Sequence, residues 1–100
     1  MAELTQEELL AVKIFKALGD PTRFKVVQML MHRDELGCGE LQSIFGLSAP
    51  AMSHHTRVLQ ECGLLVVRKE GAFHFFRLRR EQIRHFASGM LAVPAEGGLS

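Results

Sequence analysis

The stretch that decides the fold is Gly46-Leu-Ser-Ala-Pro-Ala-Met-Ser-His-His-Thr-Arg-Val-Leu-Gln-Glu-Cys62. Gly46 can adopt the positive φ of a sharp turn. Ser48 can cap a helix through its hydroxyl, and Pro50 suits a first helical turn, where its missing N–H costs nothing. At about 100° per residue, one face of this helix is mainly apolar and carries Met52, His55, Thr56, Leu59 and Cys62. The opposite face carries Pro50, Ser53, His54, Arg57 and Glu61.

Such a helix suits a domain that packs on one side of it and inserts the other side into a DNA groove. The alternative is an ordinary amphipathic helix whose outer face meets only solvent. The neighbouring sequence favours the first interpretation. A short helix over residues 40–45 precedes the stretch by a three-residue turn, and a β-hairpin follows it at once. Helix, tight turn, helix and hairpin in this order are typical of a winged helix.

The remaining segments fit the same fold. Thr5-Gln-Glu-Glu8 is a capping-box pattern that predicts a helix over residues 6–18, and Asp20-Pro21 begins a second helix. Phe24, Val27, Leu30 and Met31 are expected on the inner face of that second helix. Strands are predicted over 64–69 and 73–78, around the loop Glu70-Gly-Ala72, and a last helix over 81–93. The fold class is therefore mainly α with a small β-hairpin (α+β), a winged helix-turn-helix with two strands between its fourth and fifth helices.

Length and composition agree with a single small domain. The chain has 100 residues, of which 47% are hydrophobic, so we expect one domain over 1–94 and a flexible tail over 95–100. No apolar run approaches the roughly 18 residues of a membrane span, and no leader pattern opens the chain, which predicts a cytoplasmic protein. The two cysteines form no CxxC pair, and a structural disulfide is not expected.

The positive charges are concentrated in one part of the chain. Net charge is only +1, but residues 41–100 hold seven Lys and Arg against four acids, and six of the seven lie between Arg57 and Arg80. A local basic patch binds phosphates even when the whole chain is near neutral. The sequence therefore predicts a double-stranded DNA partner, contacted by Ser48, Ala49, Pro50, Ser53, His54, Arg57, Arg68, Lys69, His74 and Arg77.

Two apolar helices lie at opposite ends of a domain whose middle is already a complete unit. The last helix has apolar residues at i, i+3, i+4, i+7 and i+8, which is usually a core pattern within one chain. Because the first helix is apolar on several sides as well, we predict a homodimer. Its interface is expected to contain Leu10, Ile14, Ile83, Phe86, Ala87, Met90 and Leu91.

Specific short motifs lie between residues 15 and 78. They are Phe15-Lys-Ala-Leu-Gly-Asp-Pro-Thr-Arg23, Glu40-Leu41, Phe45-Gly-Leu-Ser48, Met52-Ser-His-His55, Leu59, Cys62-Gly-Leu64 and Arg68-Lys-Glu-Gly71. With these motifs the chain resembles the bacterial ArsR/SmtB family of winged-helix repressors. The resemblance implies a homodimer built from the first and last helices, with recognition helices in adjacent major grooves of a palindromic operator. It also implies that repression is relieved when a small effector binds.

The chain departs from the family pattern at the sensor positions. The family's arsenic and antimony sensors typically carry Cys-Val-Cys where this chain has Gly37-Cys-Gly39, and one thiol cannot supply two or three soft ligands. The family's zinc sensors place Asp and His where Arg80 and Gln82 stand here. We therefore expect neither a metal nor a cofactor. Thr56 replaces a usual Leu and is expected to bond to the preceding turn, and Ala72 replaces a common basic wing residue.

Other constellations are weaker. His54 and His55 are adjacent and diverge on a helix, so they cannot chelate one ion, and Ser53-His54 has no third group to form a nucleophilic site. The chain is thus not expected to be an enzyme. Cys38 remains a candidate sensor thiol beside the simpler interpretation that it packs. The alternatives to a DNA-binding repressor are a metal- or thiol-responsive sensor of the same family and a winged-helix protein-interaction module.

Overall fold

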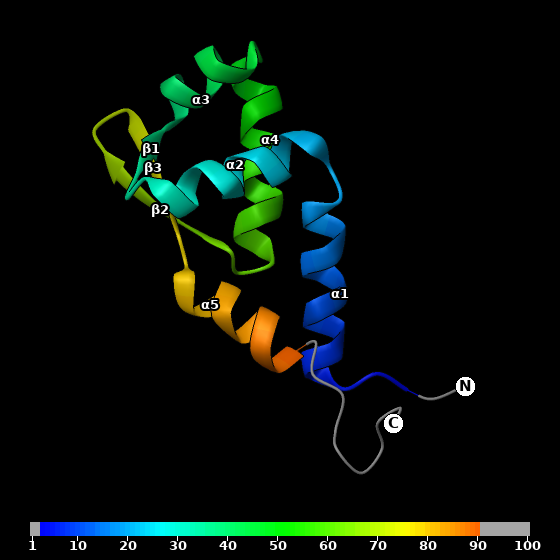
Figure 1. The fold of residues 1–100 in the computed structure, drawn as a ribbon. Helices are drawn as coiled ribbons and strands as arrows, with labels where there is room; N and C mark the ends of the chain where they lie inside the picture. Colours follow the sequence, from blue (N-terminus) through cyan, green and yellow to red (C-terminus); the bar gives the residue numbers. More distant parts are fainter. Residues whose placement is uncertain (1–2, 91–100) are drawn as a thin grey trace.

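The computed structural model describes residues 3–90 (Figure 1). Its elements are α1 (Gln6–Leu18), α2 (Pro21–His32), β1 (Leu36–Gly37), α3 (Cys38–Phe45), α4 (Ala49–Glu61), β2 (Leu65–Glu70), β3 (Phe73–Leu78), α5 (Arg80–His85) and a π-helical turn, η1 (Phe86–Met90). The predicted winged helix-turn-helix is confirmed. No helix in the described part of the chain is long and apolar enough to cross a membrane.

Local capping interactions begin the first two helices. The Thr5 hydroxyl accepts from the Glu8 amide at 3.1 Å, and the Glu8 carboxylate accepts from the Thr5 amide at 2.9 Å, which is the predicted capping box. The Asp20 carboxylate accepts from the Arg23 amide at 3.1 Å and caps α2, with Pro21 as its first residue. These caps satisfy backbone donors that have no partner within a helix, so both starts lie where the sequence predicted them.

The sheet has one strand more than predicted. It is antiparallel in the order β1-β3-β2, with Leu36 opposite Phe76 and Arg68 opposite Phe75. The predicted two-stranded hairpin is therefore only part of the sheet. The sequence did not predict β1, because a strand of two residues is too short to show the alternation of apolar and polar residues. The third helix begins at Cys38, two residues earlier than predicted.

The core lies between the helices and one face of the sheet. The side chains with no exposed surface are Ile14, Val26, Leu30, Leu36, Leu41, Met52, Leu59 and Leu64. On α2, Val27 and Leu30 are buried as expected, but Phe24 and Met31 remain 49% and 43% exposed. The prediction for those two residues was wrong, because the buried face of α2 is centred on Val26, Val27 and Leu30 instead.

The C-terminal helical segment runs back toward the start of α1 (Figure 1). His85 Nε2 lies 2.6 Å from a carboxylate oxygen of Glu7, and the rings of Phe86 and Phe15 meet edge to face at 5.0 Å. The last helix was predicted over 81–93. Its α-helical part ends at His85, η1 follows to Met90, and residues 91–93, with the predicted tail 95–100, lie outside the described residues.

Candidate nucleic-acid interface

The turn before α4 and the start of α4 are built by three residues. Gly46 ends α3 with φ of 64°, in the left-handed region that favours glycine. The Ser48 hydroxyl then accepts from the Ala51 amide at 3.3 Å, and Pro50 lies in the first turn. The helix buries Met52, Thr56 and Leu59 and leaves Ser48, Ala49, Pro50, His54 and Arg57 exposed. The predicted division of α4 into an inner and an outer face is therefore confirmed.

A polar cluster fixes the rotation of α4 about its axis. Arg23, on α2, donates from Nε to the carbonyl of Ala17 at 2.6 Å, and its Nη1 lies 3.2 Å from Nδ1 of His55 on α4. An arginine can only donate, so this contact requires an unprotonated Nδ1. The Asp20 carboxylate lies 3.6 Å from the same nitrogen. The hydrogen bond from the Arg23 amide, with help from the Arg23 charge, holds the pKa of Asp20 below its ordinary value.

Within α4, Thr56 is 2% exposed, and its hydroxyl donates to the carbonyl of Ser53 at 3.2 Å. This is the back-bond that the sequence predicted, and it satisfies a polar group in the core without a partner from another element. Cys62 closes the helix, and its thiol donates to the carbonyl of Leu59 at 3.4 Å. Burial raises the pKa of Cys62, which suits a packed and unreactive thiol.

A groove of about 240 Å³ separates α4 from the hairpin of β2 and β3. Successive strand residues point to opposite faces, so Val67, Lys69, His74 and Phe76 share the face toward α4. The groove is lined by Ser53, Thr56, Arg57, Gln60, Val67, Lys69, His74 and Phe76. Two of these side chains are apolar, while two cations, an imidazole, two hydroxyls and an amide supply the polar groups. The Thr56 hydroxyl donates to the Ser53 carbonyl, and the other five polar residues can donate hydrogen bonds to phosphate oxygens or base edges.

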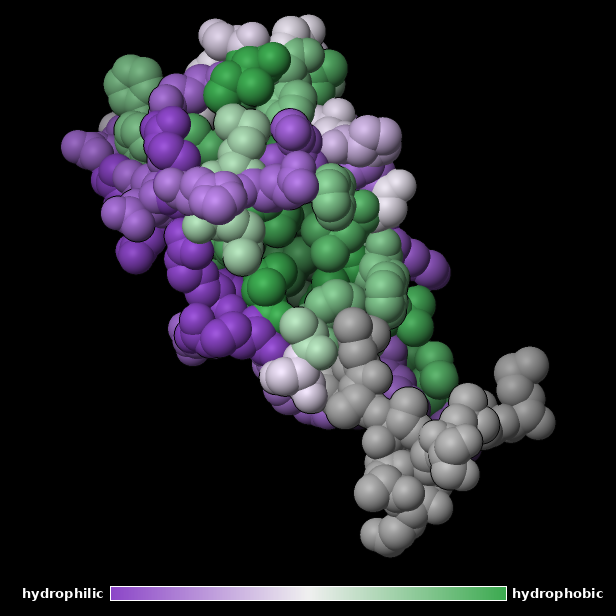
Figure 2. All heavy atoms as spheres, in the orientation of Figure 1, coloured by the Kyte–Doolittle hydropathy of each residue, from purple (hydrophilic) through white to green (hydrophobic). Residues whose placement is uncertain are grey.

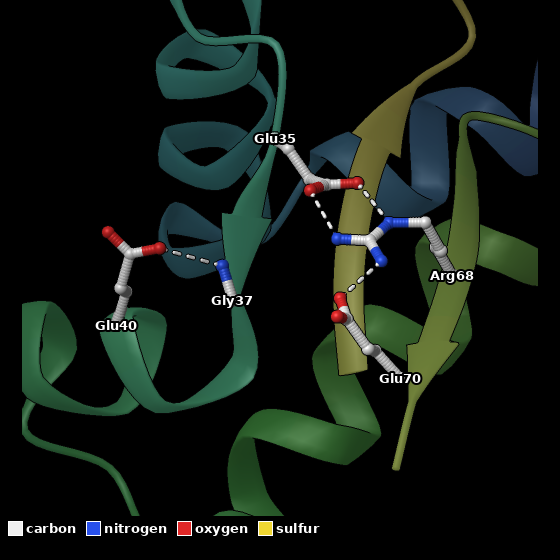
Figure 3. A network of polar contacts seen from close by, with 5 residues as sticks. All are labelled: Glu35, Gly37, Glu40, Arg68 and Glu70. Carbon is white, nitrogen blue, oxygen red and sulfur yellow. Dashed lines mark hydrogen bonds and ion pairs between the residues drawn. The ribbon is translucent and has the colours of Figure 1, made fainter. Parts of the chain in front are cut away.

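The other face of the hairpin has a different character. Arg68 Nε and Nη2 donate to the two carboxylate oxygens of Glu35 at 3.0 and 2.8 Å, and Nη1 donates to Glu70 at 2.7 Å (Figure 3). The guanidinium also lies 4.5 Å from the centroid of the Phe75 ring. Arg68 was predicted to bind DNA, but its donors are engaged by two carboxylates. The structure thus gives Arg68 intramolecular partners that the sequence did not predict, since Glu35 lies 33 residues away, before β1, and Glu70 lies two residues further along β2. Its contact with DNA stays a prediction.

Arg77 also lies on this second face. Its register partner is Val66, and its side chain is exposed. It does not line the groove beside α4, so the fold does not bring it together with Lys69 and His74, and its contact with DNA stays a prediction. Of the four hairpin residues predicted to contact DNA, Lys69 and His74 lie beside α4, whereas Arg68 and Arg77 do not. Strand alternation was the signal that separates the two pairs.

Cys38 is the first residue of α3 and is partly exposed. It lies in a second groove, of about 440 Å³, with Ala72, Phe73 and Phe75 of the hairpin on the opposite side. Arg80, at the position of a family zinc ligand, donates to the carbonyls of Met31 and Leu30 at 3.0 Å each. Within residues 3–90, no three or more His, Cys, Asp or Glu side chains lie close enough together to hold a metal ion.

The predicted dimer residues differ in burial. Ile14 has no exposed surface and Phe86 is only 9% exposed, so both belong to the core of the single chain. The prediction that they form the interface directly is corrected, because neighbouring residues of α1 are the exposed ones. These are Leu9, Val12 and Phe15, at 45%, 38% and 55%. Leu10 and Ile83 are half-buried and Ala87 is exposed, while Leu91 lies outside the described residues, as does the side chain of Met90.

The apolar surface gathers where α1 and α5 approach each other. Figure 2 shows hydrophobic residues over this flank of the molecule and hydrophilic residues on the side of the hairpin. Leu9, Leu10 and Val12 also line a groove on α1, together with the lysines Lys13 and Lys16. The molecule therefore presents a polar, partly basic side and an apolar side at different places on its surface.

Three residues of the interface and its supports were not predicted from the sequence. Gln60 lines the groove beside α4, and its position seven residues after Ser53 and three after Arg57 could have placed it on the same face. Arg23, which joins α2 to α4, and Arg80, which binds the last carbonyls of α2, had no comparable local signal. Their partners lie 32 and about 50 residues away, and only the fold brings them together.

Comparisons with known proteins cover most of the chain. A family model described as a helix-turn-helix domain matches residues 18–68. The transcriptional repressor SdpR of Bacillus subtilis is 30% identical over 78 residues, which are 78% of this chain and 86% of that protein. The arsenical resistance operon repressor of Escherichia coli is 39% identical over 70% of this chain and 60% of its own length. The crystal structure of an ArsR family transcriptional regulator matches with a TM-score of 0.73 at 27% identity, covering 88% of this chain and 87% of that one.

Proposed function

The chain belongs to the ArsR/SmtB family of winged helix-turn-helix transcriptional regulators, and from that premise we propose that it is a homodimeric repressor of a palindromic operator. It is a DNA-binding regulator; the proposal concerns its assembly, its operator and the residues that read DNA. In this proposal α4 enters the major groove with Ser48, Ala49, Pro50, Ser53, His54 and Arg57 toward the DNA. Lys69 and His74 follow the adjacent phosphate backbone.

The observation that carries the proposal is the groove between α4 and the hairpin. Arg57 and Lys69 supply two positive charges there, from two different elements, with Ser53 and His74 beside them. Arginine and lysine on phosphate oxygens fix the position of a protein on a duplex, while short donors at the start of a helix reach base edges. A protein-interaction module would not need these donors around one groove.

The exposed apolar stripe of α1 supports a homodimer. Leu9, Val12 and Phe15 are each exposed by more than a third, and α5 and η1 lie beside the same flank. Apolar surface of this kind is stabilised when a second copy covers it. Dimeric helix-turn-helix proteins read two half-sites about 34–36 Å apart, one turn of DNA, so we expect a two-fold axis at this stripe to give the two α4 helices that spacing. The operator would then be palindromic.

Repression would be relieved by an effector, and Cys38 is the residue we propose to test first. Its thiol is partly exposed in the groove between α3 and the hairpin. An oxidant that acts through this thiol would release wild-type protein from DNA and leave Cys38→Ser bound. If both proteins respond equally, Cys38 is not the sensor.

The proposed function is tested by selecting duplexes from a random library with the wild-type protein and sequencing them. We expect the selected duplexes to contain an inverted repeat. Titration of that duplex, at several salt concentrations, should give an affinity that falls steeply with salt, because bound phosphates release counterions. Selection of no common sequence, or binding without a salt dependence, would contradict the proposal.

A further inference from the structure

Arg68 connects all three strands of the sheet. It lies on β2, its register partner is Phe75 on the central strand β3, and its guanidinium stacks on the Phe75 ring at 4.5 Å. Beyond that ring it reaches Glu35, the residue that precedes β1. One side chain therefore crosses from one edge of the sheet to the other. A hairpin of two strands is marginally stable by itself, and this contact adds a side-chain link to the β1–β3 pairing that joins the hairpin to the rest of the domain.

The geometry of the contact restricts movement in more than one direction. Glu35 receives two parallel hydrogen bonds from the planar guanidinium, an arrangement that defines the orientation of both groups. Glu70 holds the third nitrogen, and the Phe75 ring supports the flat face of the guanidinium. An isolated surface ion pair contributes little, but a bidentate and stacked arginine is fixed on three sides. The hydrogen bonds from Arg68 correspondingly hold the pKa of Glu35 below its ordinary value.

The contact continues into the helix-turn-helix. β1 leads directly into α3, since Gly37 is both the end of β1 and the N-cap of that helix. The Gly37 amide donates to the carboxylate of Glu40, on the first turn of α3, at 2.9 Å (Figure 3). Fixing Glu35 therefore fixes the hairpin relative to α3, and α3 packs on α4. The hairpin also packs on α4 directly through β2, so this connection is a second restraint on how far Lys69 lies from Arg57.

A direct phosphate contact by Arg68 is the alternative. Two features oppose it. Arg68, Glu35 and Glu70 together carry one positive and two negative charges, and the nearby Arg77, whose charge also acts on Glu35, only brings the sum to zero, so this face has no excess positive charge to attract phosphate. The cluster also lies on the face of the hairpin opposite to Lys69 and His74.

We propose that Arg68 and Glu35 are positioning residues, which hold the hairpin at the distance from α4 at which Lys69 and His74 reach the DNA backbone. This inference rests on the proposed DNA-binding function. Arg68 contributes to operator affinity without touching DNA, and Glu35 contributes although its charge opposes DNA binding. If Glu35 positions the hairpin, removing its negative charge weakens operator binding; if it only repels DNA, removing the charge strengthens binding.

The test compares Glu35→Gln, Arg68→Gln and Arg68→Lys with the wild type on the selected duplex. We expect each to weaken binding by about three- to tenfold, or ~0.7–1.4 kcal/mol, with an unchanged dependence of log affinity on log salt. Arg68→Lys is expected to weaken binding too, because lysine cannot form the two parallel hydrogen bonds that the guanidinium makes with Glu35. The matched control is Asp34→Asn, the same change of charge at the exposed neighbouring residue, which should bind equally or slightly more tightly.

Hydrogen exchange in the free protein supplies a second measurement. Amides of residues 65–78 should exchange faster in Glu35→Gln and Arg68→Gln, and those of α4 should not change. The inference is overturned if Glu35→Gln tightens binding as Asp34→Asn does while Arg68→Gln lowers the salt slope by about 0.9, the loss of one phosphate contact. It is also overturned if neither affinity nor exchange changes. If the wild type selects no duplex, the proposed function is contradicted. The hydrogen-exchange rates of residues 65–78 would then still show whether Arg68 and Glu35 hold the hairpin in place.

Discussion

Lys69 and Arg68 are adjacent cations whose surroundings give them opposite roles. Lys69 lines the groove beside α4, whereas Arg68 is held by two carboxylates on the other face of the hairpin. Charge alone does not indicate which residue is available to DNA. At the scale of the residue, function therefore depends on which side of a strand a side chain occupies and on what lies there.

Arg57 is the cation of α4 that we expect to contact DNA. Arg57→Ala should weaken operator binding by about 1–3 kcal/mol if the side chain reads a base, or lower the salt slope by about one unit if it binds phosphate. Titration at several salt concentrations distinguishes the two results. Lys25→Ala is the control, since Lys25 is exposed on α2 outside the groove and its loss removes the same charge. Equal affinity and slope for wild type and Arg57→Ala would contradict the interface.

The cap at Asp20 should make stability depend on pH. Asp20→Ala is expected to lower the free energy of unfolding by about 1 kcal/mol at neutral pH, because it removes the acceptor for the Arg23 amide. The pKa of Asp20 is lower in the folded state than its ordinary value of 3.8. The stabilisation by the ionised Asp20 carboxylate is therefore fully present above that value, and it is lost as the pH falls through the folded-state pKa.

Urea unfolding between pH 5 and about pH 2 measures this effect. The difference between wild type and Asp20→Ala should shrink toward the acid end of the range. Asp20→Asn is the control, because it keeps an oxygen acceptor and does not titrate, so its advantage over alanine should stay constant. A wild-type advantage that is equally large at both ends would refute the ionic part of the cap.

At the scale of the element, the end of α3 is set by one glycine. Gly46 has φ of 64°, and an added Cβ would meet nothing within 4 Å, so only backbone strain opposes a side chain there. Gly46→Ala should destabilise the protein by about 1–2 kcal/mol. Gly39→Ala, in the first turn of the same helix with equally open space, should stabilise it by about 0.4–1 kcal/mol. Thermal unfolding should show shifts of opposite sign; shifts of the same sign would contradict this account of the turn.

At the scale of the whole molecule, the exposed stripe of α1 is the surface that we expect a second copy to cover. Leu9→Asp and Val12→Asp should give folded monomers that bind the operator weakly, because one half-site contributes less than two. Sedimentation at micromolar concentration and circular dichroism measure assembly and folding. Phe73→Asp is the control, an equivalent change at the hairpin, where the side chain is 70% exposed. If Leu9→Asp or Val12→Asp forms dimers as stable as those of the wild type, the dimer interface does not include this stripe of α1.

Ile14 provides the complementary prediction. Its neighbours on α1 are exposed, but Ile14 has no exposed surface. Ile14→Ala should therefore lower the free energy of unfolding by about 2–5 kcal/mol, through lost contacts and a cavity, with dimerisation affected only through folding. Urea unfolding of the variant measures the loss. A loss below ~1 kcal/mol would show that Ile14 is not part of the core.

The sequence by itself determined the helix-turn-helix, the helix starts at Thr5, Asp20 and Ser48, and the two faces of α4. Caps, a glycine turn and helical periodicity act over a few residues, so their signals are local and readable. Only the tertiary structure decided that β1 joins the sheet, that Glu35 removes Arg68 from the DNA-binding groove, and that Ile14 is covered while Val12 is not. Each of these depends on contacts with residues from distant parts of the chain. Such contacts produce no periodic pattern in the neighbouring sequence, so they cannot be predicted from it.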